Sequence, residues 1–314
     1  MIKLIDLETY PVQPVLDRLL EDKTTKQNII FATDAYAANG EGFSETSQIT
    51  AEKLLGFSKK IQIQPRVEKA SDEQLARTRK KAEVFTPSWI VNKMNNHCDE
   101  EWFGRPNVFN TEDGAGWVTN YAPIVFEGKA TWKKYVDSKR LEITCGEAPY
   151  VVSRYDAATG EIIPIEDRIG ILDRKLRVVN ENAADDAEWL KWTIRALQSS
   201  YGYEFQGDNL LIARVNVLNT MVEHYEKRFG TKPDVKFLRK MTNIICWNFW
   251  QMDGLTGTIP FSIPPASEQQ MSLFEFFDDV IEEQQLSIMP ICRIMDWRKD
   301  ISVSYDTIRG GKQP

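Results

Sequence analysis

The feature that most constrains the fold is a short apolar segment followed by one long amphipathic helix. "SYGYEF" (residues 200–205) has the composition of a strand, and "GDNLLIARVNVLNTMVEHYEKRFG" (207–230) follows it directly. The apolar positions of this second segment repeat with helical spacing at Leu211, Val215, Leu218, Val222, Tyr225 and Phe229. Gly230 is placed where a helix C-cap is expected. The pair predicts a β-α unit.

Further strand and helix patterns alternate along the chain. "RLEITCG" (140–146), "NIICWNFWQMDGL" (243–255) and "IMPICRIMDW" (288–297) read as buried strands. "SWIVNKMNNHC" (88–98), "DDAEWLKWTIRALQSS" (185–200) and "DVKFLRKMTNI" (234–244) read as helices, and "SDEQLARTRKKAE" (71–83) as a charged one. Such alternation is typical of a parallel α/β sheet.

The same patterns suggest a division of the chain. Residues 1–80 are expected to form a small N-terminal α+β appendage, with a strand in "NIIFATDAY" (28–36). Residues 81–314 are expected to form the α/β core, with inserted loops near 103–137 and 155–185 and a hairpin turn at 158–160.

Composition argues against several classes of protein. The four cysteines are far apart and only two histidines are present, so a zinc site is not expected and no metal ligands are assigned. No apolar run approaches the ~18 residues of a membrane span. The N-terminus has acids where a secretion signal needs bases. We therefore expect a cytoplasmic protein without a membrane partner, with free thiols at Cys98, Cys145, Cys246 and Cys292.

Polar residues follow three of the predicted strands. Cys145 and Gly146 end the first strand, Glu204 ends the second, and Asp253 ends the third. In an open α/β sheet, ligands bind beyond the carboxyl ends of the strands. A glycine there admits a ligand close to the backbone, and the acids can accept hydrogen bonds from ribose hydroxyls and a base amino group. The pattern predicts a nucleoside-cofactor pocket, although each acid alone is as consistent with a helix cap or a loop ion pair.

The motifs in this order resemble those of a known family. "AEVFTP" (82–87), "LEITCGEAPY" (141–150), "YGYEFQGDNLLIARVNVL" (201–218) and "NIICWNFWQMDGL" are similar to the cofactor motifs of the amino-methylating, adenine-specific DNA methyltransferases of restriction–modification systems. The whole chain resembles short proteins described as restriction-endonuclease methylation subunits. The resemblance implies a Rossmann-like methyltransferase core, possibly incomplete, and S-adenosyl-L-methionine as the cofactor.

The resemblance also implies residue roles. Phe85, Thr86 and Pro87 would lie against the methionine end of S-adenosyl-L-methionine. Glu142, Cys145 and Gly146 would line the turn beneath it. Glu204 would hold the ribose and Asp253 the adenine amino group.

The chain departs from the family pattern at three places. Glu142 replaces the usual Asp, and Glu147 begins the "EAP" that replaces the second glycine of the turn. The catalytic Asn/Asp-Pro-Pro-aromatic motif is missing in that form. "SIPPAS" (262–267) has the prolines without an acid or aromatic residue, so Asp296 and Trp297 are the preferred catalytic pair. This assignment requires "ICRIMDW" to lie beside "RLEITCG", with Asp296 at the carboxyl end; the alternative is a structural strand end.

The resemblance thus implies a DNA adenine amino-methyltransferase, or a methylation subunit of a restriction–modification system, with DNA as a partner. Few residues follow Trp297, so a partner subunit for restriction or methylation is expected to complete the core. The alternative is a non-catalytic relative that binds DNA or a partner and keeps the methyltransferase fold. A restriction nuclease subunit ranks last, because no Pro-Asp…Asp/Glu-x-Lys pattern is recognised.

Overall fold

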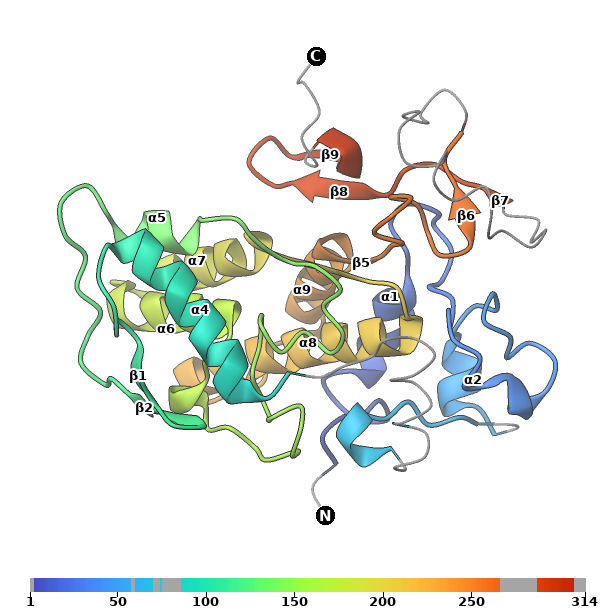
Figure 1. Ribbon diagram of the computed structural model, residues 1–314, viewed down its shortest axis with the longest axis horizontal. Helices are drawn as coiled ribbons and strands as arrows, with labels where there is room; N and C mark the ends of the chain where they lie inside the picture. The colour runs from blue at the N-terminus through green and yellow to red at the C-terminus, as the bar shows by residue number, and fades with distance from the viewer. Residues whose placement is uncertain (1–2, 58–59, 70–73, 75–85, 266–286, 308–314) are drawn as a thin grey trace.

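The structure, a computed structural model, describes residues 3–57, 60–69, 74, 86–265 and 287–307 (Figure 1). The expected charged helix at 71–83 and the first residue of the Phe-Thr-Pro motif, Phe85, lie outside these residues, apart from residue 74. The described part is a mixed helix and sheet protein, as the alternating pattern predicts. Among the described residues, no helix combines the length and the apolarity that a membrane crossing requires.

A three-stranded parallel sheet forms the centre of the predicted α/β region. Its strands are β3 (Arg140–Glu142), β4 (Ser200–Glu204) and β5 (Phe249–Gln251), in the order β3-β4-β5. Glu142 is in register with Gly202, and Glu204 with Gln251. The three predicted strands are present and pair in parallel, but the third is shorter than predicted, because residues 243–248 are helical and only Phe249–Gln251 form the strand. The carboxyl ends of the three strands meet at one edge, which we call the carboxyl edge.

Two pairs of helices connect these strands. α6 (Ile171–Asn182) and α7 (Asp186–Gln198) lie between β3 and β4 in the chain, and α8 (Gly207–Phe229) and α9 (Val235–Asn248) lie between β4 and β5. The predicted helices at α7, α8 and α9 are confirmed. The carboxylate of Asp234 accepts a hydrogen bond from the Phe237 N–H and so starts α9. Gly230 ends α8 at φ 67°, a left-handed conformation that favours glycine.

The segments predicted as inserted loops contain regular structure. α4 (Ser88–Phe103) is followed by a hairpin of β1 (Asn110–Asp113) and β2 (Gly116–Thr119), and then by α5 (Trp132–Val136). α6 fills much of the second expected loop. The hairpin turn expected at 158–160 is present, with Tyr155 bridged to Ile162.

A buried polar network joins α4 to α6. The guanidinium of Arg174, on α6, is 2.6 Å from the Asp99 carboxylate and donates at 2.8 Å to the Asn92 side-chain oxygen. Arg174 and Asp99 are both buried. The ion pair therefore fixes the two helices relative to each other in a place where an unpaired charge would be costly.

The N-terminal residues share one hydrophobic core with the rest of the chain. They form η1 (Gln13–Val15), α1 (Leu16–Leu20), η2 (Ala37–Asn39), α2 (Ala51–Leu55) and η3 (Arg66–Glu68). The predicted strand at 28–36 is wrong, because residues there form only isolated bridges, such as that of Ile30 with Gln48. Ile30 instead exchanges two hydrogen bonds with the side chain of Gln251, each 2.9 Å long. The extended segment thus crosses the end of β5.

The last predicted strand lies outside the parallel sheet. β8 (Arg293–Asp296) pairs antiparallel with β9 (Ile301–Ser304), which leads into η7 (Tyr305–Thr307), and β6 (Ser262–Ile263) pairs with β7 (Ser287–Ile288). The expectation that this strand lies beside β3 is therefore wrong. Side chains of the β8–β9 hairpin, drawn in orange to red in Figure 1, pack instead against Tyr201, Tyr203 and Trp250 of the sheet.

Candidate functional site

Two of the predicted cofactor residues contact each other at the carboxyl edge. The Gly146 N–H donates to Glu204 Oε2 at 2.8 Å, and the Gln206 N–H donates to Glu204 Oε1 at 3.1 Å. The Cys145 N–H donates to the Tyr203 carbonyl at 2.8 Å, which aligns the turn after β3 with the end of β4. The turn and the acid that the sequence places about sixty residues apart therefore form one unit.

Glu142 lies beside this unit in an unusual electrostatic environment. Burial raises the pKa of its carboxyl well above the ordinary value, and the neighbouring Glu204 raises it further. N–H groups of Tyr150 and Val151 oppose this shift. Oε2 of Glu142 is buried and has no hydrogen-bond partner among the described residues. A positively charged or hydrogen-donating group at this atom would stabilise the carboxylate.

Asp253 follows the end of β5 in a tight turn. Its Oδ1 accepts the Leu255 N–H at 2.8 Å, and its own N–H donates to the Thr258 carbonyl. A side chain at Gly254 would lie 2.9 Å from the Tyr203 hydroxyl, so the glycine permits the close approach of this turn to β4. Asp253 is half-buried at the same edge as Glu204.

Cys145 is a packing residue. It is 1% exposed, and burial raises the pKa of its thiol well above the ordinary value. A side chain at Gly202 would lie 3.1 Å from Cys145 Sγ, which shows how closely the thiol packs on β4. A buried thiol whose pKa is raised makes a poor nucleophile.

Thr86 and Pro87 precede α4 and border a different region. The Ser88 N–H donates to Asp156 Oδ2 at 2.7 Å, which fixes the helix start. Pro87 lines a pocket of about 760 Å³ between the β1–β2 hairpin and residues 156–167. Neither Gly146 nor Glu204 lines this pocket. Proximity of this motif to the carboxyl edge thus remains a prediction.

Asp296 and Trp297 lie at the opposite edge of the sheet from Glu204. Asp296 Oδ1 is 3.6 Å from Lys139 Nζ, just before β3, and Trp297 Nε1 donates at 2.7 Å to Asn248, just before β5. We call this the amino edge. Glu204 is four positions after Ser200 along β4, which corresponds to about 13 Å at the rise of a strand. Asp296 ends its strand as expected, but its expected place beside the carboxyl end of β3 is wrong, because its hairpin packs on the face of the sheet and reaches the amino edge.

The environment of Asp296 keeps it ionised. Burial alone would raise its pKa, but the Arg298 N–H and the nearby Lys139 and Lys299 bring the pKa below the ordinary value. Trp297 packs partly against the core and uses its indole N–H within the protein. Both side chains thus have structural partners.

Sequence reasoning missed the role of Glu147. Its Oε1 accepts the Arg66 N–H at 2.6 Å, and its Oε2 accepts the Tyr155 hydroxyl at 2.6 Å. The side chain that replaces a glycine of the family pattern is thereby bonded to the N-terminal region at Arg66 and to the nearby Tyr155. The one signal in the sequence that pointed to Glu147 is the replacement of the family's second glycine by "EAP".

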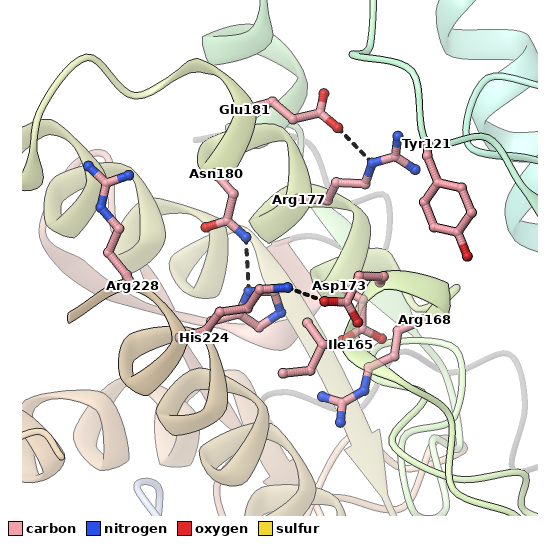
Figure 2. A pocket seen from close by; sticks show the side chains of 11 residues that line it. Tyr121, Ile165, Arg168, Asp173, Arg177, Asn180, Glu181, His224 and Arg228 are labelled. Carbon is pink, nitrogen blue, oxygen red and sulfur yellow. Dashed lines mark hydrogen bonds and ion pairs between the residues drawn. The ribbon is translucent and has the colours of Figure 1, made fainter. Parts of the chain in front are cut away.

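A second polar site lies between α6 and the C-terminal half of α8. Figure 2 shows this pocket of about 350 Å³, in which Asn180 points toward His224. The Trp189 indole donates to Asn180 Oδ1 at 2.7 Å, so the amide nitrogen faces His224 Nδ1 at 3.1 Å as a donor. Nδ1 therefore accepts, and the ring proton is on Nε2. Nε2 has no partner among the described residues, and burial, with repulsion from Arg168, lowers the pKa of His224 to about 3.

The described residues contain no group of three or more His, Cys, Asp and Glu side chains arranged to hold a metal ion. Comparison of the chain with protein-family models, curated proteins and solved structures found no match.

Proposed function

We propose that the protein is a methylation subunit of a restriction–modification system that binds S-adenosyl-L-methionine at the carboxyl edge of a Rossmann-like sheet. One observation carries the proposal: the buried, unpartnered Oε2 of Glu142 beside the Gly146–Glu204 contact. The cofactor carries an ammonium group, which fits a buried carboxylate that lacks a donor. A cofactor diol and an adenine amino group would add donors for the neighbouring acids.

The bound cofactor supplies an activated methyl group, and the residues of this chain would position it. Glu142 would hold the ammonium group, and Gly146 would let the cofactor approach the backbone. Glu204 would accept from the ribose and Asp253 from the adenine amino group. Thr86 and Pro87 would contact the methionine end, with Phe85, as the motif resemblance implies.

The separation of the two edges bears on catalysis. Methyl transfer to an adenine amino group is a direct displacement, so the acceptor must be within contact distance of the donor. Asp296 is at the amino edge, about 13 Å from the level of Glu204 along β4. We therefore infer that the residue that positions the adenine comes from a partner subunit bound to this chain and to DNA.

A second function is a non-catalytic relative that binds DNA or a partner. The hydrogen bonds of Glu147 favour it, because this side chain occupies the turn where the family pattern has a glycine. The two functions differ in whether the carboxyl edge still takes the cofactor.

Titration calorimetry with S-adenosyl-L-methionine, S-adenosylhomocysteine and adenosine tests the proposal. A hydrogen bond to a charged group contributes ~1.5–3 kcal/mol, so Glu142→Gln should weaken the first two ligands about tenfold or more. Adenosine has no ammonium group, and its affinity should not change. Glu204→Gln should weaken all three ligands, and Asp296→Asn none.

Absence of binding to the unsubstituted protein would reject the cofactor site and favour the non-catalytic relative. Equal affinity of the Glu142→Gln variant for S-adenosylhomocysteine would reject the assigned role of Glu142. Transfer of a radiolabelled methyl group to unmethylated DNA, with and without a co-expressed partner subunit, then tests catalysis. Full activity of the isolated chain would contradict the need for a partner.

A further inference from the structure

Basic side chains gather at the amino edge of the sheet. Two pockets there have volumes of about 650 and 670 Å³. They are lined by seven cationic residues and two carboxylates, Asp137 and Asp296. We call this surface the amino-edge face; its cations are Lys139, Arg140, Lys191, Arg195, Lys240, Arg298 and Lys299.

The charge of this face is opposite to that of the whole protein. The chain has a formal net charge of −7, whereas the amino-edge face has an excess of five positive charges. The rest of the chain is therefore more acidic than the net charge alone indicates. A polyanion is repelled by the rest of the molecule and attracted to this face, which orients its approach.

Ion pairs hold part of the face rigid. Asp137 lies between two arginines: it is bonded to Arg195 and is 2.7 Å from the Arg298 guanidinium, and all three residues line the pocket of about 650 Å³. Lys139 is 3.6 Å from Asp296. The two carboxylates of the face are therefore paired with cations of the same face.

Three lysines on separate elements remain for a ligand. Lys191 lies on α7, Lys240 on α9, and Lys299 in the turn between β8 and β9. All three are exposed, and none has an ion pair within 4 Å among the described residues. Their spread over three elements suits a row of phosphates better than one small anion, which would need convergent donors.

We propose that the amino-edge face binds the phosphate backbone of double-stranded DNA. The proposal deepens the proposed function by assigning the DNA a surface, and it requires no contact with the cofactor. Exposed lysines on rigid elements give backbone contacts that position a duplex without reading its sequence. Contacts of this kind release condensed counterions, so the affinity must depend steeply on salt.

Fluorescence anisotropy with a labelled 30-base-pair duplex, at several salt concentrations and without cofactor, tests the proposal. Each phosphate contact contributes about −0.9 to the slope of log affinity against log salt. The triple variant Lys191→Gln, Lys240→Gln, Lys299→Gln should therefore flatten this slope by about 2.7.

A matched variant controls for net charge. The change Lys93→Gln, Lys129→Gln, Lys232→Gln removes three exposed charges that line neither pocket, and it should leave the slope unchanged. Equal flattening by both triple variants would overturn the proposal, as would the absence of DNA binding at 50 mM salt. Competition by poly-glutamate as effective as that by DNA would overturn it in favour of an acidic protein partner. The DNA-binding experiment uses no cofactor, so a negative result would not contradict the proposed cofactor site. Likewise, a negative result in the cofactor titration would not contradict DNA binding at the amino-edge face.

Discussion

His224 should make the protein sensitive to mild acid. Its side chain is 3% exposed on α8, and its Nδ1 already accepts the Asn180 amide. Protonation would place a second proton on a buried ring next to Arg168, whose positive charge also disfavours the imidazolium. The pKa of His224 is about 3 in the folded protein, against 6.5 for an exposed histidine. The folded protein therefore stays neutral at His224 where the unfolded chain becomes charged.

The sign and size of the effect follow from proton linkage. Between pH 6.5 and 3 the unfolded chain binds a proton at His224 that the folded protein does not bind. The free energy of unfolding therefore falls as the pH falls through this range. One pKa unit corresponds to ~1.4 kcal/mol, so lowering the pH from 7 to 5 costs about 2 kcal/mol of stability through this residue alone.

Urea unfolding at pH 7 and pH 5 measures the effect, with His224→Gln as the reference. Glutamine does not titrate, and its side-chain oxygen can accept the Asn180 amide. Other groups that titrate, including the nearby Glu166 and Glu223, contribute to both proteins. The unsubstituted protein should lose about 2 kcal/mol more than the variant between the two pH values. The same pH dependence in both proteins would refute the reasoning, because it would mean that His224 titrates normally when folded.

Two further predictions concern packing and charge. Gly207→Ala would place a side-chain carbon 1.9 Å from the Ile30 carbonyl oxygen, so it should destabilise the protein by about 1–3 kcal/mol or more, measured by urea unfolding. Gly116→Ala is the control: its added carbon would have its nearest neighbour at 3.5 Å, so this variant should change the urea midpoint little. Arg174→Met should cost ~3 kcal/mol, the low end for a broken buried ion pair, because the Asp99 carboxylate keeps the Tyr135 hydroxyl at 3.0 Å and the Arg140 guanidinium at 3.6 Å. Thermal unfolding should show partial recovery in the double variant Arg174→Met, Asp99→Leu, and no recovery would mean that the loss is one of packing.

The sequence predicted those parts of the fold whose patterns are local. The apolar strands β3, β4 and β5, and the long stripe of α8, need no distant information, and their alternation sufficed for the parallel order. The contact of Gly146 with Glu204 then followed from the meeting of strand ends at one edge. The positions of Glu204 and Asp253 at the carboxyl edge were predicted from the ends of their strands. The ligand that they would bind stays a prediction.

The misses have physical causes in tertiary structure. α6 was not recognised although Leu172, Leu176 and Val179 repeat with helical spacing. The sequence could not show that the charged residues between them, Asp173, Arg174 and Lys175, are also buried. Their partners lie on other elements, as Asp99 does for Arg174. A local sequence pattern cannot predict that a charged side chain is buried when its ion-pair or hydrogen-bond partner is distant in the sequence.

The misplacement of Asp296 has a different cause. The apolar run before it fits a central strand as well as a hairpin strand. The chain reverses immediately afterwards, with the Lys299 N–H bonded to the Asp296 carbonyl and Asp300 at φ 55°. Aspartate tolerates this left-handed conformation, so "RKD" was a turn signal that the strand interpretation overlooked.

The two hydrogen bonds between Ile30 and the Gln251 side chain have a consequence for how the protein is made. These residues are 221 positions apart. At the translation rate of about 5–20 residues per second, the segment around Ile30 would leave the ribosome roughly 10–40 s before its partner is synthesised. Buried neighbours such as Ile29 and Phe31 are exposed during this interval. The segment around Ile30 therefore stays undocked, with its apolar neighbours open to chaperones, until synthesis has passed Gln251.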